Sequence, residues 1–334
     1  MHVARDARSA KSAGLAFAIL SSVAFGGSGP FAKALIAAGF SPEQAAWLRI
    51  TGSAVVLVPL VLALRGRAGM AAATRSWPQL VVYGVTGVAG CQTLFFVAAS
   101  RLPVGVAILL EFTGPVLVVG WLRFVRRSVV PRSAVIGVAV ALVGLACVVE
   151  VWTGLSLDLV GLLAGLGAAA CQAGYFLIID RLTGVTDPLV MTAAGSVVGA
   201  VVLTLVAVPW AAPFGVLGDV VPIGAHRAPA WTFALWIILV STVVAYLAGV
   251  AAVQRLSAAI GGAIAYVEVV TASLFALVLL GERLTATQVL GGLIVVAGAF
   301  IAQTGVSRAT HHEVAPGELT PLEVLTEQEA RAAS

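Results

Sequence analysis

The chain has 334 residues, 60% of them hydrophobic and only 10% charged, with a formal net charge of +4. Soluble domains carry about 25% charged residues. This composition therefore excludes a soluble enzyme and a nucleic-acid-binding protein, and it predicts a polytopic helical membrane protein.

Ten apolar runs are long enough to cross a bilayer, since a membrane-spanning helix needs about 20 predominantly apolar residues. We therefore expect an all-α membrane protein with ten transmembrane helices that end at Pro, Gly or charged residues. In chain order, the expected spans are 13–37, 44–64, 78–99, 103–122, 133–151, 158–179, 188–209, 231–254, 257–280 and 286–304. A short segment, 1–11, precedes them, and the polar tail 305–334 is expected to be flexible.

The lysines and arginines predict which way the spans face. If the N-terminus lies inside, the inner loops and termini hold 14 of the 19 basic residues, the outer side holds four, and Arg49 lies within a span. Cytoplasmic loops of membrane proteins are enriched in Lys and Arg. Both termini are therefore expected to be cytoplasmic.

The sequence repeats itself after five spans. Gly137 and Gly144 recur as Gly291 and Gly298 at an offset of 154 residues, and VIGVAVALVGL at 135–145 is matched by VLGGLIVVAGA at 289–299. We therefore expect two five-helix repeats, 12–151 and 158–304. Because five is odd, the second repeat enters the membrane from the opposite side. Inverted repeats are typical of alternating-access transporters, and duplication that serves stability alone is the alternative.

Three sequence runs carry a family resemblance that covers about 12–304. They are SRLPVGVAILLEFTGP at 100–115, RLSAA at 255–259 and LLGERL at 279–284. With its two repeats, the chain resembles the EamA-type proteins of the drug/metabolite transporter superfamily, and LEFTGP at 110–115 is similar to the threonine and homoserine exporters among them. The resemblance implies export of small amino acids across a bacterial inner membrane. One departure is Val269, which follows Glu268 where the second repeat of the family usually has proline.

Two carboxylates lie within the expected spans, Glu111 in the fourth and Glu268 in the corresponding ninth. Glu111 follows Pro103 by eight residues and Glu268 follows Ser257 by eleven, which is about 12 and 16 Å of helix. Both therefore lie near the middle of the bilayer, where a charge costs at least about 2.5 kcal/mol. We expect these side chains to face a substrate or to exchange protons. The alternative is a neutral glutamic acid that is hydrogen-bonded between helices.

Helix-breaking residues follow Glu111. Gly114 loosens the helix, and Pro115 has no amide hydrogen to donate to the carbonyl of Glu111. A kink with a free carbonyl beside a carboxylate suits an ammonium group or a proton. Pro30 is expected to interrupt the first span in the same way, since such interruptions often border binding sites, although they also permit close helix packing.

Arg49 is the cation within the second span. We expect it to pair with Glu111 or to attract a substrate carboxylate, and the alternative is that its side chain snorkels to the outer interface. Polar and aromatic side chains of other spans form a second group of candidate cavity-lining residues: Ser28, Gln92, Phe95, Gln172, Tyr175 and Tyr266.

The spans lack the residue patterns of metal, cofactor or catalytic chemistry. The four histidines lie outside the apolar runs, and the three cysteines within them have no metal-binding spacing. We therefore expect no enzyme, cofactor or metal, but a gradient-driven exporter of small solutes, coupled to protons through Glu111. The alternatives are another solute, such as a drug-like cation or a sugar derivative, and a non-transporting membrane component. The ten spans predict a monomer or a homodimer in the lipid bilayer.

Overall fold

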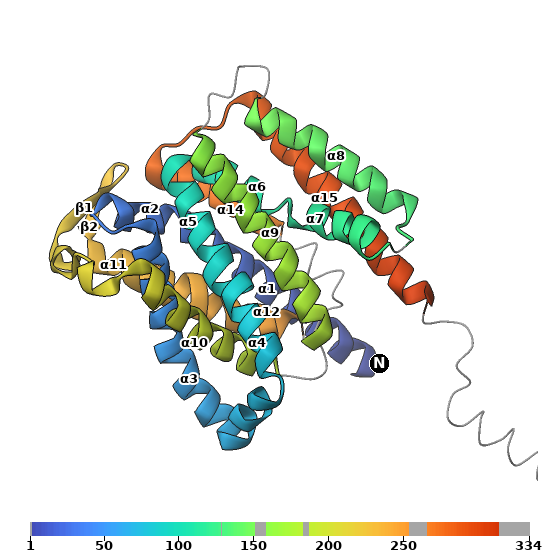
Figure 1. Cartoon of the computed structure of the whole chain (residues 1–334), viewed down its shortest axis with the longest axis horizontal. Coiled ribbons are helices and arrows are strands. Elements are labelled where there is room, and N and C mark those ends of the chain that lie inside the picture. Colours follow the sequence, from blue (N-terminus) through green and yellow to red (C-terminus); the bar gives the residue numbers. More distant parts are fainter. Residues whose placement is uncertain (1, 128, 151–157, 183–186, 254–265, 314–334) are drawn as a thin grey trace, which may run out of the picture.

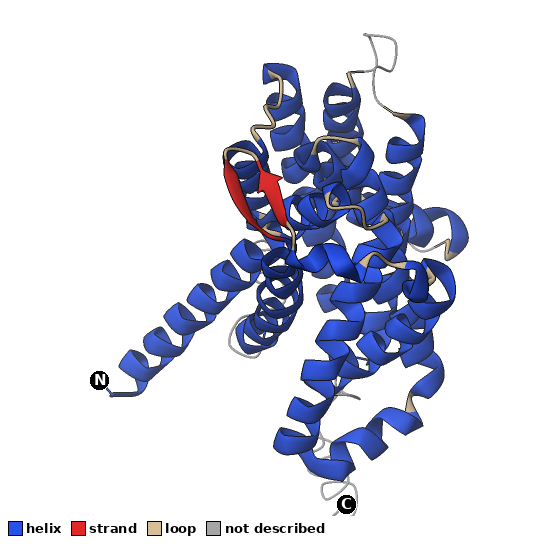
Figure 2. Cartoon of the chain, turned by 90° about the vertical axis from the view of Figure 1, so that its left-hand side faces the viewer, coloured by secondary structure: helices blue, strands red, loops and turns tan. Residues whose placement is uncertain are grey.

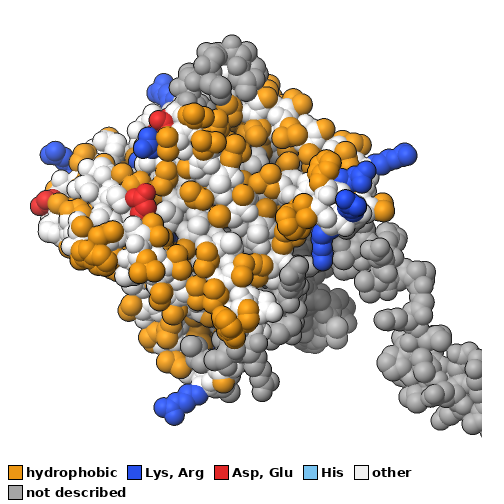
Figure 3. Space-filling view, viewed as in Figure 1, with side chains coloured by type: hydrophobic (Ala, Val, Ile, Leu, Met, Phe, Trp, Pro, Cys, Tyr) orange, Lys and Arg blue, Asp and Glu red, His pale blue; other side chains and the backbone are white. Residues whose placement is uncertain are grey.

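The computed structural model describes residues 2–127, 129–150, 158–182, 187–253 and 266–313, and these are mainly helical (Figure 1). Seven helical segments are long and apolar enough to cross a membrane. Three shorter apolar helices, Leu159–Tyr175, Val267–Leu280 and Ala286–Ala302, coincide with the sixth, ninth and tenth expected spans. Hydrophobic side chains cover much of the face in Figure 3, as a lipid-facing surface requires.

The first half contains eight α-helices and two π-helical segments, η1 and η2, which continue spans without a break. Its elements are α1 (His2–Gly26), α2 (Ser28–Ala37), α3 (Pro42–Arg75), α4 (Trp77–Tyr83), η1 (Gly84–Gly90), α5 (Cys91–Arg101), α6 (Val104–Glu111), α7 (Gly114–Gly120), η2 (Trp121–Val125) and α8 (Arg132–Val149).

The second half has a similar series with an inserted hairpin. Its elements are α9 (Leu159–Leu182), α10 (Pro188–Ala207), the short turns η4 (Pro209–Ala211) and η5 (Phe214–Gly218), β1 (Val220–Ile223), β2 (His226–Pro229), α11 (Ala230–Leu235), π-helical η6 (Trp236–Val244), α12 (Ala245–Val253), α14 (Val267–Phe275), π-helical η7 (Ala276–Leu280) and α15 (Ala286–Glu313).

Two spans of the first half are broken close to a proline. α1 ends at Gly26 and α2 begins at Ser28, since Pro30 cannot donate the helical bond to the Gly26 carbonyl. α6 ends at Glu111, and α7 begins at Gly114 with Pro115 as its second residue. Each break therefore lies next to a candidate site residue, Ser28 or Glu111.

The most extensive helix pairings join the two halves. α8 packs on α15, α3 on α10, α5 on α9 and α1 on α12, and α8 and α15 run side by side in Figure 1. Glycines permit the α8–α15 approach: a Cβ on Gly137 would lie 2.6 Å from the Gly298 oxygen, and one on Gly298 would lie 2.7 Å from the Gly137 oxygen. Gly144 and Gly291 meet in the same way further along the pair.

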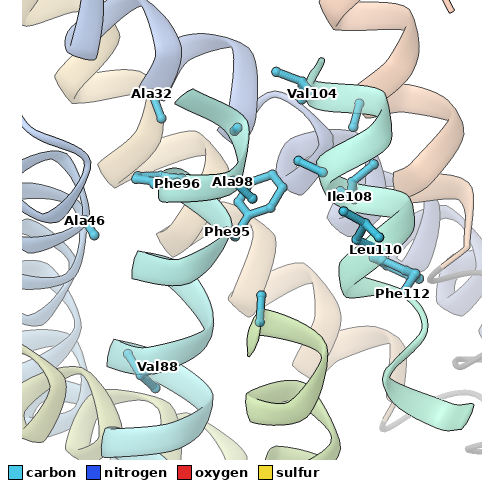
Figure 4. Packing of buried hydrophobic residues seen from close by; sticks show 14 of the residues in the cluster. Ala32, Ala46, Val88, Phe95, Phe96, Ala98, Val104, Ile108, Leu110 and Phe112 are labelled. Atoms are coloured by element: carbon cyan, nitrogen blue, oxygen red, sulfur yellow. The ribbon is translucent and has the colours of Figure 1, made fainter. Parts of the chain in front are cut away.

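The main hydrophobic core is built around α6 and α5. Every residue of α6 from Val104 to Leu110 is buried. Figure 4 shows the Phe95 ring in the space between α5 and α6, close to Ile108. Apolar packing on all sides of α6 fixes the place of Glu111, the last residue of this helix.

One short sheet departs from the all-α expectation. β1 and β2 pair antiparallel with Ile223 opposite His226 (Figure 2). The two residues between them form the turn, and Gly224 supplies its positive φ of 57°. A Cβ on Gly224 would lie 2.1 Å from the Leu279 oxygen, so the hairpin turn sits directly on the end of η7.

The ends of the chain also differ from expectation. α1 begins at His2 and includes most of the segment 1–11, and α15 continues to Glu313, so the first nine residues of the expected tail are helical. The rest of the tail, 314–334, and the start of the ninth expected span, 257–265, lie outside the described residues.

Candidate functional site

Arg49 lies in α3 with its guanidinium group enclosed by four oxygen atoms. Nε donates to Thr242 Oγ1 at 2.8 Å, and Nη2 donates to the Ser241 carbonyl at 2.9 Å. Nη1 donates to Ser28 Oγ and to Gln92 Oε1, both at 2.6 Å. Ser28 and Gln92 belong to the first half and Ser241 and Thr242 to the second, so Arg49 ties the halves together.

The side chain of Arg49 is only 1% exposed, so the alternative, that it snorkels to the outer interface, does not hold. Its four bonded oxygens are neutral, and the Phe96 ring lies 5.6 Å from the guanidinium carbon. Among the described residues Arg49 forms no ion pair, and direct pairing with Glu111 is absent there. Arg49 nevertheless interacts electrostatically with both Glu111 and Glu268. The site therefore holds a buried cation that contacts no counter-ion in the described part of the chain.

Glu111 is held through one carboxylate oxygen. Its Oε1 accepts from the Cys91 thiol at 3.2 Å and from Gln172 Nε2 at 3.3 Å. Within the described part of the chain, Oε2 has no hydrogen-bond donor. The residue is half-buried, so the protein fixes one oxygen of Glu111 and leaves the other without a described donor.

Gly114 supports this arrangement from the far side of the helix break. A Cβ at this position would lie 2.5 Å from the Gln172 side-chain oxygen. A larger residue here would therefore displace the Gln172 amide, which donates to Glu111 in this arrangement.

Glu268 is the second residue of α14 and is half-buried. Its carboxylate makes no hydrogen bond or ion pair to a described residue. It interacts electrostatically with Glu111 and with Arg49. The ninth span thus contributes a second acceptor to the same group of charges.

The aromatic candidates mainly pack against other rings. Tyr175 lies 5.6 Å from Tyr83, and Tyr266 lies 5.6 Å from Phe112, measured between ring centroids. Phe95 is buried beside Phe96 and against Gly29. These contacts place the three candidates in the walls of the bundle. Pro30 and Pro115 contribute helix breaks rather than polar groups.

Sequence reasoning missed three members of the cluster: Cys91, Ser241 and Thr242. Cys91 reads as one more small apolar residue in its span. Ser241 and Thr242 are adjacent hydroxyl residues within an apolar run, and this polar pair is the sequence signal that could have identified them as site residues. The Ser241 hydroxyl is also buried without a partner among the described residues.

Ion pairs between the elements lie apart from this cluster. Lys33 Nζ contacts Glu282 Oε1 at 2.5 Å and the Leu102 carbonyl at 3.2 Å, while Glu282 Oε2 accepts from the Val104 amide at 2.7 Å. Glu282 therefore joins the ends of the first and ninth spans to the start of the fourth. Arg101 pairs with Asp158 at 3.5 Å.

The described residues contain no group of three His, Cys, Asp or Glu side chains that could hold a metal ion.

The sequence matches the EamA-like transporter family twice, over residues 12–150 and 159–304. The chain belongs to this family. The resemblance read from the sequence is thus confirmed, and each matched segment corresponds to one half of the chain. Family membership and the apolar helices identify a multi-pass membrane transporter.

Curated relatives agree with this assignment. The chain is 30% identical over 228 residues to the threonine/homoserine exporter RhtA of Salmonella typhimurium strain LT2, which covers 66% of this chain and 69% of that protein. It is 31% identical over 222 residues to the protein of the same name from Escherichia coli K12, covering 63% and 66%. It is 26% identical over 231 residues to the uncharacterized transporter YwfM of Bacillus subtilis strain 168, covering 67% and 74%.

A solved structure titled "Crystal structure of protein" covers 89% of this chain and 98% of its own, with a TM-score of 0.56 and 22% identity. This likeness concerns the fold alone. Family and relatives together indicate a transporter of the bacterial inner membrane rather than an enzyme.

Proposed function

We propose that this chain is an alternating-access exporter of small amino acids, threonine and homoserine among them, and that Arg49, Glu111 and Glu268 form its solute site. The observation that supports this most is a buried cation that is enclosed by both halves and interacts electrostatically with two carboxylates. Neither carboxylate forms an ion pair with a described residue. An α-amino acid carries one ammonium and one carboxylate group, so this set of charges is complementary to it. The names of the relatives point to the same solutes.

Each group has a role in this proposal. Oε2 of Glu111 and the carboxylate of Glu268 accept from the substrate ammonium. A guanidinium has five N–H groups and the Arg49 cage uses four, so the remaining Nη2–H donates to the substrate carboxylate. The cage must open first. It opens when Ser241 and Thr242 move away from Ser28 and Gln92, which is a movement of one half against the other.

The packing supports ten spans in two inverted repeats. The offset of 154 residues relates Gly137 to Gly291 and Gly144 to Gly298. If the repeats are equivalent, a contact of Gly137 with Gly298 requires a matching contact of Gly291 with Gly144, and both contacts exist. The helix pairings show the same equivalence. α5 packs on α9, which joins spans three and six, and α12 packs on α1, which joins the corresponding spans eight and one. We propose repeats over 12–151 and 158–304, with both termini in the cytoplasm as the basic residues predict.

Proton coupling follows from the shared acceptors. A proton and a substrate ammonium group both carry positive charge to Glu111 and Glu268, so binding of one disfavours the other. Exchange of substrate for protons across the membrane is the transport cycle that such competition supports.

The test is counterflow of labelled threonine into proteoliposomes that contain wild type, Glu111→Gln or Glu268→Gln. Loss of one member of a buried charged contact costs about 2–5 kcal/mol, so Glu111→Gln should slow uptake by at least about thirtyfold while the protein stays folded. Glu43→Gln is the matched control, because Glu43 lies in the first turn of α3, away from the cluster. An imposed pH gradient should change the rate of wild type.

Full threonine counterflow by folded Glu111→Gln protein would overturn the proposed site. A rate of threonine flux that does not change with the pH gradient would overturn the proposed proton coupling but not the proposed solute site. One observation favours a second solute class: the glutamates are half-buried while Arg49 is fully enclosed, which suits a cation without a carboxylate. Competition by an organic cation, with none by threonine or homoserine, would decide for that class.

A further inference from the structure

Four arginines lie at the junction of the fourth and fifth expected spans: Arg123, Arg126, Arg127 and Arg132. All four are exposed, and none forms an ion pair with another described residue. No Asp or Glu occurs between Glu111 and Glu150. The segment therefore concentrates positive charge with no acid of its own to balance it, and this favours binding of an anion.

Exposed apolar side chains stand among these arginines. Trp121, Phe124 and Val129 are 47%, 80% and 96% exposed. η2 ends one candidate span, Val104–Val125, and α8 begins the next at Arg132. In Figure 3, basic side chains gather beside hydrophobic ones at the right edge, where Figure 1 draws α7 and the start of α8. Tryptophan and arginine together at the end of a span are typical of the headgroup level of a bilayer.

We propose that this arginine cluster binds the phosphate groups of anionic phospholipids in the surrounding leaflet. A guanidinium group donates two parallel hydrogen bonds to a phosphate, while Trp121 and Phe124 lie against the acyl chains. The bound lipid would anchor α7 and η2, the half-span that follows the break after Glu111. Lipid binding does not depend on which solute is carried, although its assignment to the cytoplasmic leaflet rests on the orientation proposed above.

Trp121 provides the reporter for a test on the purified full chain. Its fluorescence is measured in mixed detergent micelles that contain brominated phosphatidylglycerol or brominated phosphatidylcholine at equal mole fractions. The Trp121 signal is the difference between wild type and Trp121→Phe. Each arginine near an anionic surface strengthens binding by roughly fivefold. We therefore expect brominated phosphatidylglycerol to quench Trp121 at a several-fold lower mole fraction than brominated phosphatidylcholine does. Added salt should reduce this preference for the anionic lipid.

The matched variants compare two basic surfaces. Arg123→Gln, Arg126→Gln and Arg132→Gln combined should greatly weaken the preference, because only Arg127 remains, whereas Arg67→Gln in α3 should retain it. Equal quenching of wild type by the two lipids overturns the proposal, and that comparison needs no variant. An unchanged preference in the triple variant also overturns it.

Two further arms distinguish other occupants of the cluster. Inorganic phosphate at constant ionic strength should leave the preference for the anionic lipid unchanged. Loss of that preference would assign the cluster to free phosphate instead. The tail 314–334 contains four glutamates. A preference that emerges only after deletion of 314–334 would show that the tail, and not lipid, occupies the arginines.

Discussion

At the scale of single residues, the two oxygens of Glu111 have different surroundings. Oε1 is fixed by donors from α5 and α9, Cys91 and Gln172. Oε2 has no donor among the described residues. In the proposed site, a carboxylate held in this way would keep its orientation while it binds and releases a charged group, because the protein contacts need not break.

This arrangement predicts a role for the Cys91 thiol. Cys91→Val removes the donor and keeps the side chain apolar, so threonine counterflow should fall about fivefold, the equivalent of roughly 1 kcal/mol for a lost hydrogen bond. Cys91→Ser retains an O–H donor and should stay closer to wild type. The initial rate of counterflow is the measurement, and equal rates for the Val and Ser variants would contradict the prediction.

The sequence identifies the charges of the cluster but not their partners. Arg49, Glu111 and Glu268 stand out because ionisable residues are rare within spans. The bonds from Arg49 to Thr242 and Ser241, however, join residues 193 and 192 positions apart, and no spacing rule reaches that far. Cys91 has no chemical signal in the sequence beyond its residue type.

At the scale of elements, helix breaks and contacts at the ends of the spans determine how each span packs. The sequence predicts the breaks, since Pro30 and Pro115 remove helical hydrogen bonds. It does not predict the clamp of Lys33, Glu282 and the Val104 amide. That clamp forms between span ends that only the packed bundle brings together.

The Lys33–Glu282 pair should contribute more to stability than the Arg101–Asp158 pair. Its side chains are 29% and 17% exposed at 2.5 Å, against 47% and 40% at 3.5 Å. Double-mutant cycles of thermal unfolding, with Lys33→Met and Glu282→Gln or with Arg101→Met and Asp158→Asn, should give coupling energies of about 1 and about 0.2 kcal/mol. A larger coupling for the second pair would contradict this ranking.

Asp187 predicts an acid-dependent loss of stability. This N-cap of α10 accepts from Arg65 Nε at 2.8 Å and from the Leu189 and Val190 amides. Partial burial opposes ionisation, but these donors outweigh it and lower the pKa of Asp187. Its contribution is therefore complete above the ordinary aspartate pKa of about 3.9 and is lost as pH falls through the lowered pKa.

The difference in melting temperature between wild type and Asp187→Asn should accordingly be largest above about pH 5 and shrink towards pH 3. Thermal unfolding followed across this range is the measurement. A constant difference at every pH would show that the charge of Asp187 does not contribute.

At the scale of the whole molecule, the halves are held together by pairings that cross between them. Composition and apolar run length predict the helical membrane fold, and glycine spacing predicts the repeat. The hairpin of β1 and β2 is not predicted, because its residues read as an ordinary loop. Its stability depends on burial of Val221 and Ile223 against other elements.

The α8–α15 interface should be intolerant of larger side chains. Gly137→Val and Gly298→Val both place methyl groups against backbone atoms of the partner helix, so each should lower the free energy of unfolding by about 3 kcal/mol. Gly120→Ala is the control, since no atom lies within 4 Å of its added Cβ. That variant should be neutral or stabilising by up to about 1 kcal/mol. Calorimetry of the three variants is the measurement.

The pairing of α8 with α15 also bears on how the protein is made. Domains emerge from the ribosome N-terminus first, so α8 enters the bilayer long before its partner has been translated. Its glycine-lined face then meets only lipid. A chain that stalls before Ala286 therefore leaves Gly137 and Gly144 of α8 without the helix that buries them in the folded protein.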